Sequence, residues 1–98
     1  MRRRENEIEE KLRIEVSKLG GRSYKWVCPG QAGVPDRIVI AQGRIWFVEL
    51  KTMGGKLHPI QEYQHHILKR LGAEVRVIWN EDELRRFLDE IRKGESTE

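Results

Sequence analysis

Three charged residues lie where a short hairpin would bring them together: Asp36, Glu49 and Lys51. Between them, Gln42-Gly43 separates two β-rich runs and is typical of a two-residue hairpin turn. Counting outward from this turn places Asp36 directly opposite Glu49, with Cβ atoms about 4.5–5.5 Å apart. Because side chains alternate along a strand, Lys51 points to the same face as Glu49. The spacing therefore predicts two carboxylates and one ammonium at a single spot.

Like charges directly opposed on neighbouring strands destabilise a sheet, so the two acids need a compensating partner. A divalent cation bridging them would remove the repulsion, and oxygen ligands of this kind favour Mg²⁺ or Mn²⁺. Such a cation activates water and neutralises charge that develops on a phosphate. Lys51 would position the water and stabilise the transition state electrostatically. The chemistry that these groups favour is hydrolysis of a phosphodiester.

Each acid also has a simpler interpretation when it is considered alone. Asp36 follows Pro35, and Pro-Asp pairs are common in turns. Glu49 and Lys51 could be a solvated ion pair at the end of a strand. However, Glu49 lies within the apolar run 45–50, where an ionic residue is unusual unless it has a function. The shared register of Asp36 and Glu49 favours the active-site interpretation.

The first predicted helix offers a third acid. Glu5 falls inside its apolar stripe and Glu9 falls on the edge of that stripe. An acid that points toward the sheet is costly without a partner, and a metal ion held by Asp36 and Glu49 would provide one. The alternative, an ordinary acid in the first turn of a helix, remains open. The stripe consists of Ile8, Leu12, Val16 and Leu19.

Other polar residues give weaker signals. Gln61 and His65 are four residues apart, beside the apolar face of the second predicted helix, a pattern that fits a solvated polar edge equally well. His58, His65 and His66 do not share a zinc-like spacing with Cys28, which argues against a structural zinc site. Cys28 has no local support as a nucleophile.

Periodicity and turn signals predict seven elements in the order α-β-β-β-α-β-α. Strand 44–51 is apolar on both faces, so we expect it in mid-sheet with helices covering both sides. The result is an α/β fold with a mixed sheet of about four strands. The helices are expected at 5–19, 59–71 and 82–92, and the strands at 23–28, 36–41, 44–51 and 74–79. The second helix is expected to carry an apolar face of Ile60, Tyr63, Ile67 and Leu71, and the last helix is expected to point Leu84, Leu88 and Ile91 inward.

The 98 residues have room for one domain, and we expect residues 1–4 and 94–98 to be flexible tails. No stretch resembles a membrane helix or a signal peptide, and a single cysteine suits a reducing, cytoplasmic setting. A net charge of +3 suits a phosphate-rich partner. Six basic residues could either solubilise the chain or follow a nucleic-acid backbone: Arg2, Arg3, Arg4, Lys25, Arg37 and Lys56.

Three segments resemble the VRR-Nuc family of the PD-(D/E)xK nuclease superfamily: Gly33-Val34-Pro35-Asp36-Arg37, Phe47-Val48-Glu49-Leu50-Lys51, and Gln61 in a helix. The resemblance extends from about Glu5 to Trp79. It implies a restriction-endonuclease-like fold and DNA cleavage that depends on Mg²⁺ or Mn²⁺. It also implies metal ligation by Asp36, Glu49 and the backbone carbonyl of Leu50, and a catalytic role for Lys51. Glu5 would be a supporting acid, with Glu9 in reserve, and Gln61 would complete the site.

Stand-alone viral or phage members of this family are similar to Holliday-junction resolvases, which implies a homodimer acting on branched DNA, in the host cytoplasm if the chain is viral. The alternatives are a flap- or nick-directed DNA repair nuclease and a non-catalytic nucleic-acid-binding module of the same fold. A sequence-specific restriction-type enzyme is disfavoured because little surface remains for base readout. One departure is His58 before Pro59, where we expect a Ser or Thr helix cap.

Overall fold

The structure is a computed structural model that describes residues 2–52 and 54–94, with side chains from Glu7 onward. Its elements follow the predicted α-β-β-β-α-β-α order. Helix α1 begins at Arg2, so the expected tail is helical there, and α3 continues to Gly94. Residues 1 and 95–98 of the expected tails lie outside the described residues. The elements are α1 (Arg2–Lys18), β1 (Arg22–Lys25), β2 (Arg37–Ala41), β3 (Arg44–Leu50), α2 (Pro59–Arg70), β4 (Glu74–Ile78) and α3 (Glu81–Gly94).

The four strands form one mixed sheet in the order β1-β2-β3-β4. The β1–β2 and β2–β3 pairs are antiparallel, whereas β3 and β4 are parallel. Ala41 pairs with Arg44 across the turn, and both Gln42 (φ 54°) and Gly43 (φ 76°) have positive φ, as a type I′ hairpin requires. The predicted two-residue turn and its register are therefore confirmed.

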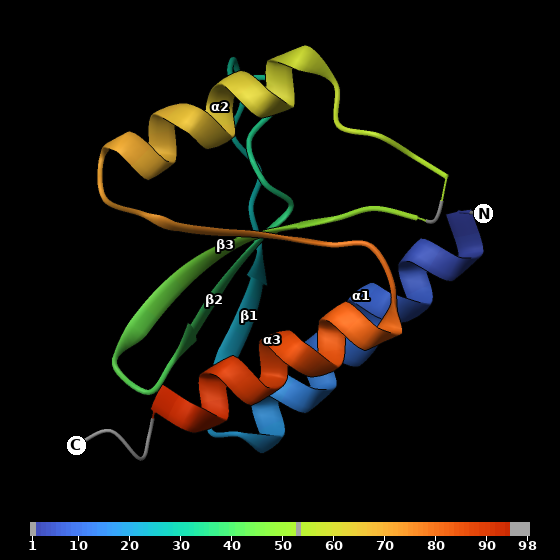
Figure 1. The fold of residues 1–98 in the computed structure, drawn as a ribbon, viewed down its shortest axis with the longest axis vertical. Coiled ribbons are helices and arrows are strands. Elements are labelled where there is room, and N and C mark those ends of the chain that lie inside the picture. The colour runs from blue at the N-terminus through green and yellow to red at the C-terminus, as the bar shows by residue number, and fades with distance from the viewer. Residues whose placement is uncertain (1, 53, 95–98) are drawn as a thin grey trace.

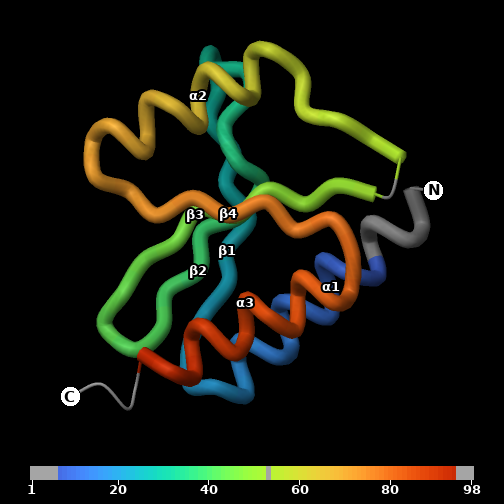
Figure 2. Tube along the Cα trace, viewed as in Figure 1, coloured from blue at the N-terminus to red at the C-terminus, as the bar shows by residue number. Residues whose placement is uncertain are grey.

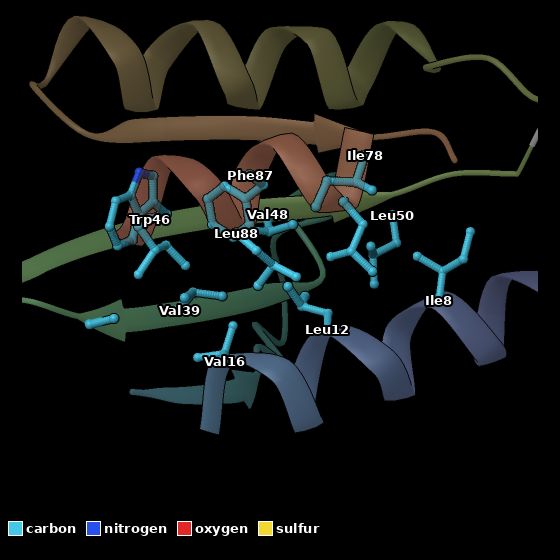
Figure 3. Close-up of a cluster of buried hydrophobic side chains, with 13 residues drawn as sticks. Ile8, Leu12, Val16, Val39, Trp46, Val48, Leu50, Ile78, Phe87 and Leu88 are labelled. Carbon is cyan, nitrogen blue, oxygen red and sulfur yellow. The ribbon is translucent and has the colours of Figure 1, made fainter. Parts of the chain in front are cut away.

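The sheet separates two unequal layers (Figure 1). Helices α1 and α3 lie together on one side, and α2 lies on the other. The α1–α3 side holds the core, in which side chains from both helices meet the inward side chains of β2, β3 and β4 (Figure 3). Among the described side chains, this layer buries thirteen hydrophobic residues, which include Ile8, Leu12, Val16, Val39, Trp46, Val48, Leu50, Ile78, Leu84, Phe87, Leu88 and Ile91.

The second layer corrects two predictions. The predicted inward stripe of α2 is largely outside, with Tyr63 59% and Leu71 79% exposed. Strand β3 is central as predicted, but only its α1–α3 face is fully covered, because Ile45 on the other face is 51% exposed. The inward face of α2 instead carries Gln61 and the buried His65. The hydrophobic stripe of α2 therefore lies on one flank of the helix and not on the face that contacts the sheet.

The loop between β1 and β2 packs against the start of α2, as Figure 2 shows. At Gly33 (φ 89°), an added Cβ would lie 2.7 Å from the carbonyl oxygen of Ile60. Further along, the Gln64 amide donates a hydrogen bond to Gln31 Oε1 at 3.2 Å. Glycine at position 33 therefore allows the loop that leads to Asp36 to approach the first turn of α2 closely.

Replacing Gly33 by alanine tests this close approach. Gly33→Ala introduces both a strained positive φ and a backbone clash, whereas Gly30→Ala (φ 83°) introduces only the strain, because nothing lies within 4 Å of its added Cβ. We expect Gly30→Ala to lower the free energy of unfolding by about 1–2 kcal/mol, and Gly33→Ala to lower it by about 1–3 kcal/mol more. Urea unfolding measures both. Equal losses in the two variants would show that the packing of the loop on α2 contributes nothing.

Candidate active site

The candidate site is centred on Glu49, a carboxylate on the α2 side of the sheet. Only 2% of the residue is exposed. Gln61 Nε2 donates a hydrogen bond to Glu49 Oε2 at 2.9 Å, and Lys51 Nζ lies 3.8 Å from the same oxygen. Burying a charged carboxylate is costly without such partners. Gln61 and Lys51 provide two of them. The strand register predicted Lys51 here, and the family resemblance implied Gln61.

Asp36 lies immediately before β2, where continuation of the β2–β3 register places it opposite Glu49. Its Oδ2 accepts a hydrogen bond from the Leu50 N–H at 2.8 Å, and its carbonyl accepts one from the Trp26 N–H at 2.8 Å. Residues that face each other across a ladder share one side of the sheet, so both carboxylates point toward the α2 side. The Leu50 N–H therefore holds one of the two Asp36 carboxylate oxygens.

The orientation of the Gln61 amide is fixed by the start of α2. His58 is the N-cap residue, and its backbone N–H donates to Gln61 Oε1 at 2.9 Å. This is the side-chain half of a capping box, in which the third helical residue reaches back to the cap. Because the amide oxygen is used in this way, the amide nitrogen must point toward Glu49. The helix therefore begins without the expected Ser or Thr, and its cap orients a site residue.

Lys51 is anchored through its backbone to the neighbouring strand. Its N–H donates to the Ile78 carbonyl at 3.0 Å, and only 15% of its side chain is exposed. This anchor continues the β3–β4 pairing by one residue beyond Leu50. The ammonium is consequently held beside Glu49 rather than extended into solvent.

Glu9 lies on the other side of the sheet. Its carboxylate binds Arg37 Nη1 at 2.6 Å and lies 3.4 Å from Lys25 Nζ. Arg37 is 8% exposed and also donates to the side chain and carbonyl of Ser23. This partly buried ion pair argues against the expected contact of Arg37 with DNA phosphates and against metal ligation by Glu9.

The remaining predicted residues are only partly described. Lys56 is exposed in the loop before α2. The side chains of Glu5, Arg2, Arg3 and Arg4 lie outside the described residues. Their expected roles as a supporting acid and as DNA contacts therefore remain predictions.

His65 is the residue that the sequence left unassigned. It is 5% exposed, and its Nε2 lies 3.8 Å from Glu49 Oε1. Burial lowers the pKa of His65, and the charge of Lys69 lowers it further. Both effects favour the neutral form of the imidazole. The only sequence signal was its spacing of four residues from Gln61, which placed both side chains on one face of α2.

The donor set suits a small, hard cation. Two carboxylates and a neighbouring backbone carbonyl are ligands that Mg²⁺ accepts together with water and substrate phosphate. Among the side chains that the structure describes (residues 7–52 and 54–94), no cluster of three or more His, Cys, Asp or Glu could hold a metal ion by itself. The oxygen donors of Asp36 and Glu49, with the Leu50 carbonyl beside them, fit Mg²⁺ or Mn²⁺ better than zinc, which favours nitrogen and sulfur ligands.

Comparisons with known proteins identify the family of the chain. No protein-family model matches the chain. The chain is 48% identical over 80 residues to "Putative nuclease p44" of Acyrthosiphon pisum secondary endosymbiont phage 1, a match that covers 81% of this chain and 86% of the relative. A solved structure described as "VRR_NUC domain" superposes with a TM-score of 0.81 at 28% identity, over 88% of this chain and 95% of that one. The chain therefore belongs to the VRR-Nuc family of nucleases.

Proposed function

We propose that the protein is a metal-dependent endonuclease that hydrolyses phosphodiester bonds in DNA. The observation that carries the proposal is the convergence of Asp36, Glu49 and Lys51 on the α2 side of the sheet, at the open end of the β2–β3 hairpin. Membership of a nuclease family supports the same reaction. A binding module without turnover would have no use for a buried carboxylate that is paired with a partly buried lysine.

Each of the side chains that meet at the site has a role in the proposed reaction. Asp36, Glu49 and the Leu50 carbonyl would hold Mg²⁺ or Mn²⁺, which when bound supplies an activated water and neutralises phosphate charge. The Leu50 N–H fixes Asp36, and Gln61 fixes Glu49. The Lys51 ammonium is positioned to orient the attacking water and to stabilise negative charge that develops on the phosphate.

The three central residues can be tested together on supercoiled plasmid and on labelled oligonucleotides. Asp36→Asn, Glu49→Gln and Lys51→Ala should each lower the cleavage rate by at least about 100-fold, because each removes charge from the reacting centre. Chelator should abolish cleavage by the wild type. Cleavage that persists equally in wild type and Asp36→Asn would come from a contaminant and would contradict the proposal.

A substitution of Gln61 can distinguish its role in capping α2 from its role in holding Glu49. Gln61→Glu keeps an acceptor for the His58 N–H but places a second carboxylate beside Glu49. We expect the thermal unfolding midpoint to stay near that of wild type, since Glu is a good capping-box residue, while activity falls about 10- to 100-fold. Glu62→Gln, one residue further along and exposed, is the matched control. Full activity in Gln61→Glu would rule out the assigned role of Gln61.

We propose further that the enzyme acts as a homodimer on branched DNA such as a Holliday junction, where two symmetric cuts need two active sites. An exposed apolar surface supports the dimer. The α2 flank (Ile60, Tyr63, Ile67 and Leu71) lies toward the β1–β2 side, because Ile60 contacts Gly33 of the β1–β2 loop. The neighbouring part of the sheet adds exposed Tyr24, Ile40 and Ile45. Exposed apolar residues that lie near one another often mark an interface between proteins, and a second copy of the chain would cover them.

Sedimentation velocity tests this surface. Tyr63→Glu places a charge within the α2 flank, so it should convert a wild-type dimer to a monomer. Ile14→Glu, at an exposed isoleucine of α1 (39% exposed), is the control and should leave the dimer intact. A wild-type protein that sediments as a monomer both with and without junction DNA would contradict the dimer.

The choice of substrate is tested with four-way junction, 5′ and 3′ flap, nicked and linear duplex DNA, each with Mg²⁺, Mn²⁺ or chelator. We expect paired cuts in the junction and little cutting of linear duplex. Cutting of flap or nicked DNA alone would favour a repair nuclease of that kind and would overturn the junction assignment, while leaving the nuclease reaction intact.

A further inference from the structure

Both oxygens of the Glu49 carboxylate face side chains of α2. Gln61 Nε2 donates to Oε2 at 2.9 Å, and His65 Nε2 lies 3.8 Å from Oε1. Gln61 and His65 are one helical turn apart, so both project from the same face of α2 toward β3. A carboxylate held at one oxygen can still rotate about that contact. A carboxylate held at both oxygens has its plane fixed.

The His65 imidazole is buried beside the Glu49 carboxylate. The side chains of His65 and Glu49 are 6% and 3% exposed. His65 Nε2 makes no hydrogen bond to any residue in the described part of the chain. A buried polar atom without a hydrogen bond raises the free energy of the folded protein. A small movement that gives His65 Nε2 a hydrogen bond would remove this cost. Closing the gap to Glu49 Oε1 by about 1 Å would give an ordinary hydrogen bond.

The nitrogen of His65 that faces Glu49 is Nε2. An imidazole nitrogen that carries its proton donates one hydrogen bond, so a ring with its proton on Nε2 places a donor next to Glu49 Oε1. This arrangement complements the Gln61 amide, which already donates to Glu49 Oε2.

We propose that His65 is a positioning residue: its Nε2–H holds Oε1 of Glu49, while Gln61 holds Oε2, so that the carboxylate is fixed in the orientation that binds the metal ion. The inference rests on the proposed function, because it takes Glu49 to be a metal ligand. It adds a residue of α2 that acts through Glu49 and does not itself contact the metal or the DNA. Partners of this kind orient ligands in many metal sites.

The test compares three variants of the full chain. His65→Leu removes the donor, His65→Gln keeps an amide N–H at a similar reach, and His66→Leu changes the exposed neighbouring histidine as a matched control. Mn²⁺ binding is measured by titration calorimetry without DNA, and the thermal unfolding midpoint is measured in chelator. We expect His65→Leu to bind Mn²⁺ about 10- to 100-fold more weakly, His65→Gln to recover most of the affinity, and His66→Leu to match wild type.

Cleavage kinetics give a second readout. In His65→Leu the metal concentration for half-maximal activity should rise in proportion to the loss of Mn²⁺ affinity, whereas the rate at saturating metal should change less. A purely structural role would instead lower the unfolding midpoint and leave Mn²⁺ affinity unchanged, and that result would overturn the proposal. If His65→Leu does not fold, His65→Asn, whose amide is too short to reach Glu49, replaces it against His65→Gln, and equal affinities in that pair would overturn the proposal.

The same titrations separate this inference from the proposed function. If wild type binds Mn²⁺ and Glu49→Gln weakens the binding while His65→Leu does not, only the role of His65 fails. If wild type does not bind Mn²⁺, or Glu49→Gln binds it equally well, the proposed function fails and this inference fails with it.

Discussion

The placement of Asp36 opposite Glu49 is the constraint on which the rest of the structure depends. Two carboxylates side by side at the end of a hairpin repel each other, and the surrounding contacts hold them there in spite of that repulsion. The Leu50 N–H binds Asp36, while Gln61 and Lys51 lie against Glu49. In the proposed function, a cation bound between the two carboxylates would remove this repulsion.

The two layers of the fold have different roles. The α1–α3 side is a conventional apolar core that fixes the register of β2 and β3. On the other side, α2 presents polar groups inward, and its N-cap orients the Gln61 amide. Gly33 allows the loop before Asp36 to rest on the start of the same helix. Helix α2 therefore contacts Glu49 through Gln61 and contacts the loop before Asp36 through Ile60. A movement of α2 would change the positions of both acids.

Local signals were enough to predict the order of elements, the register and the convergence at Glu49, because a two-residue turn and strand alternation depend only on neighbouring residues. They were not enough for α2. Its apolar stripe predicted a buried face, yet periodicity does not say what covers that face, and Tyr63 and Leu71 are exposed in this chain. The burial of His65 and the Arg37–Glu9 pair both depend on packing between elements distant in sequence, which no local pattern encodes.

A double-mutant cycle on Mn²⁺ affinity tests most directly whether Asp36 and Glu49 share one cation. Wild type, Asp36→Asn, Glu49→Gln and the double variant are compared by the paramagnetic resonance signal of free Mn²⁺. Two ligands of one ion should be strongly coupled, so that either single change removes most of the binding and the double variant is scarcely worse. Independent, additive losses, or a double variant that still binds Mn²⁺ as tightly as wild type, would contradict the shared site.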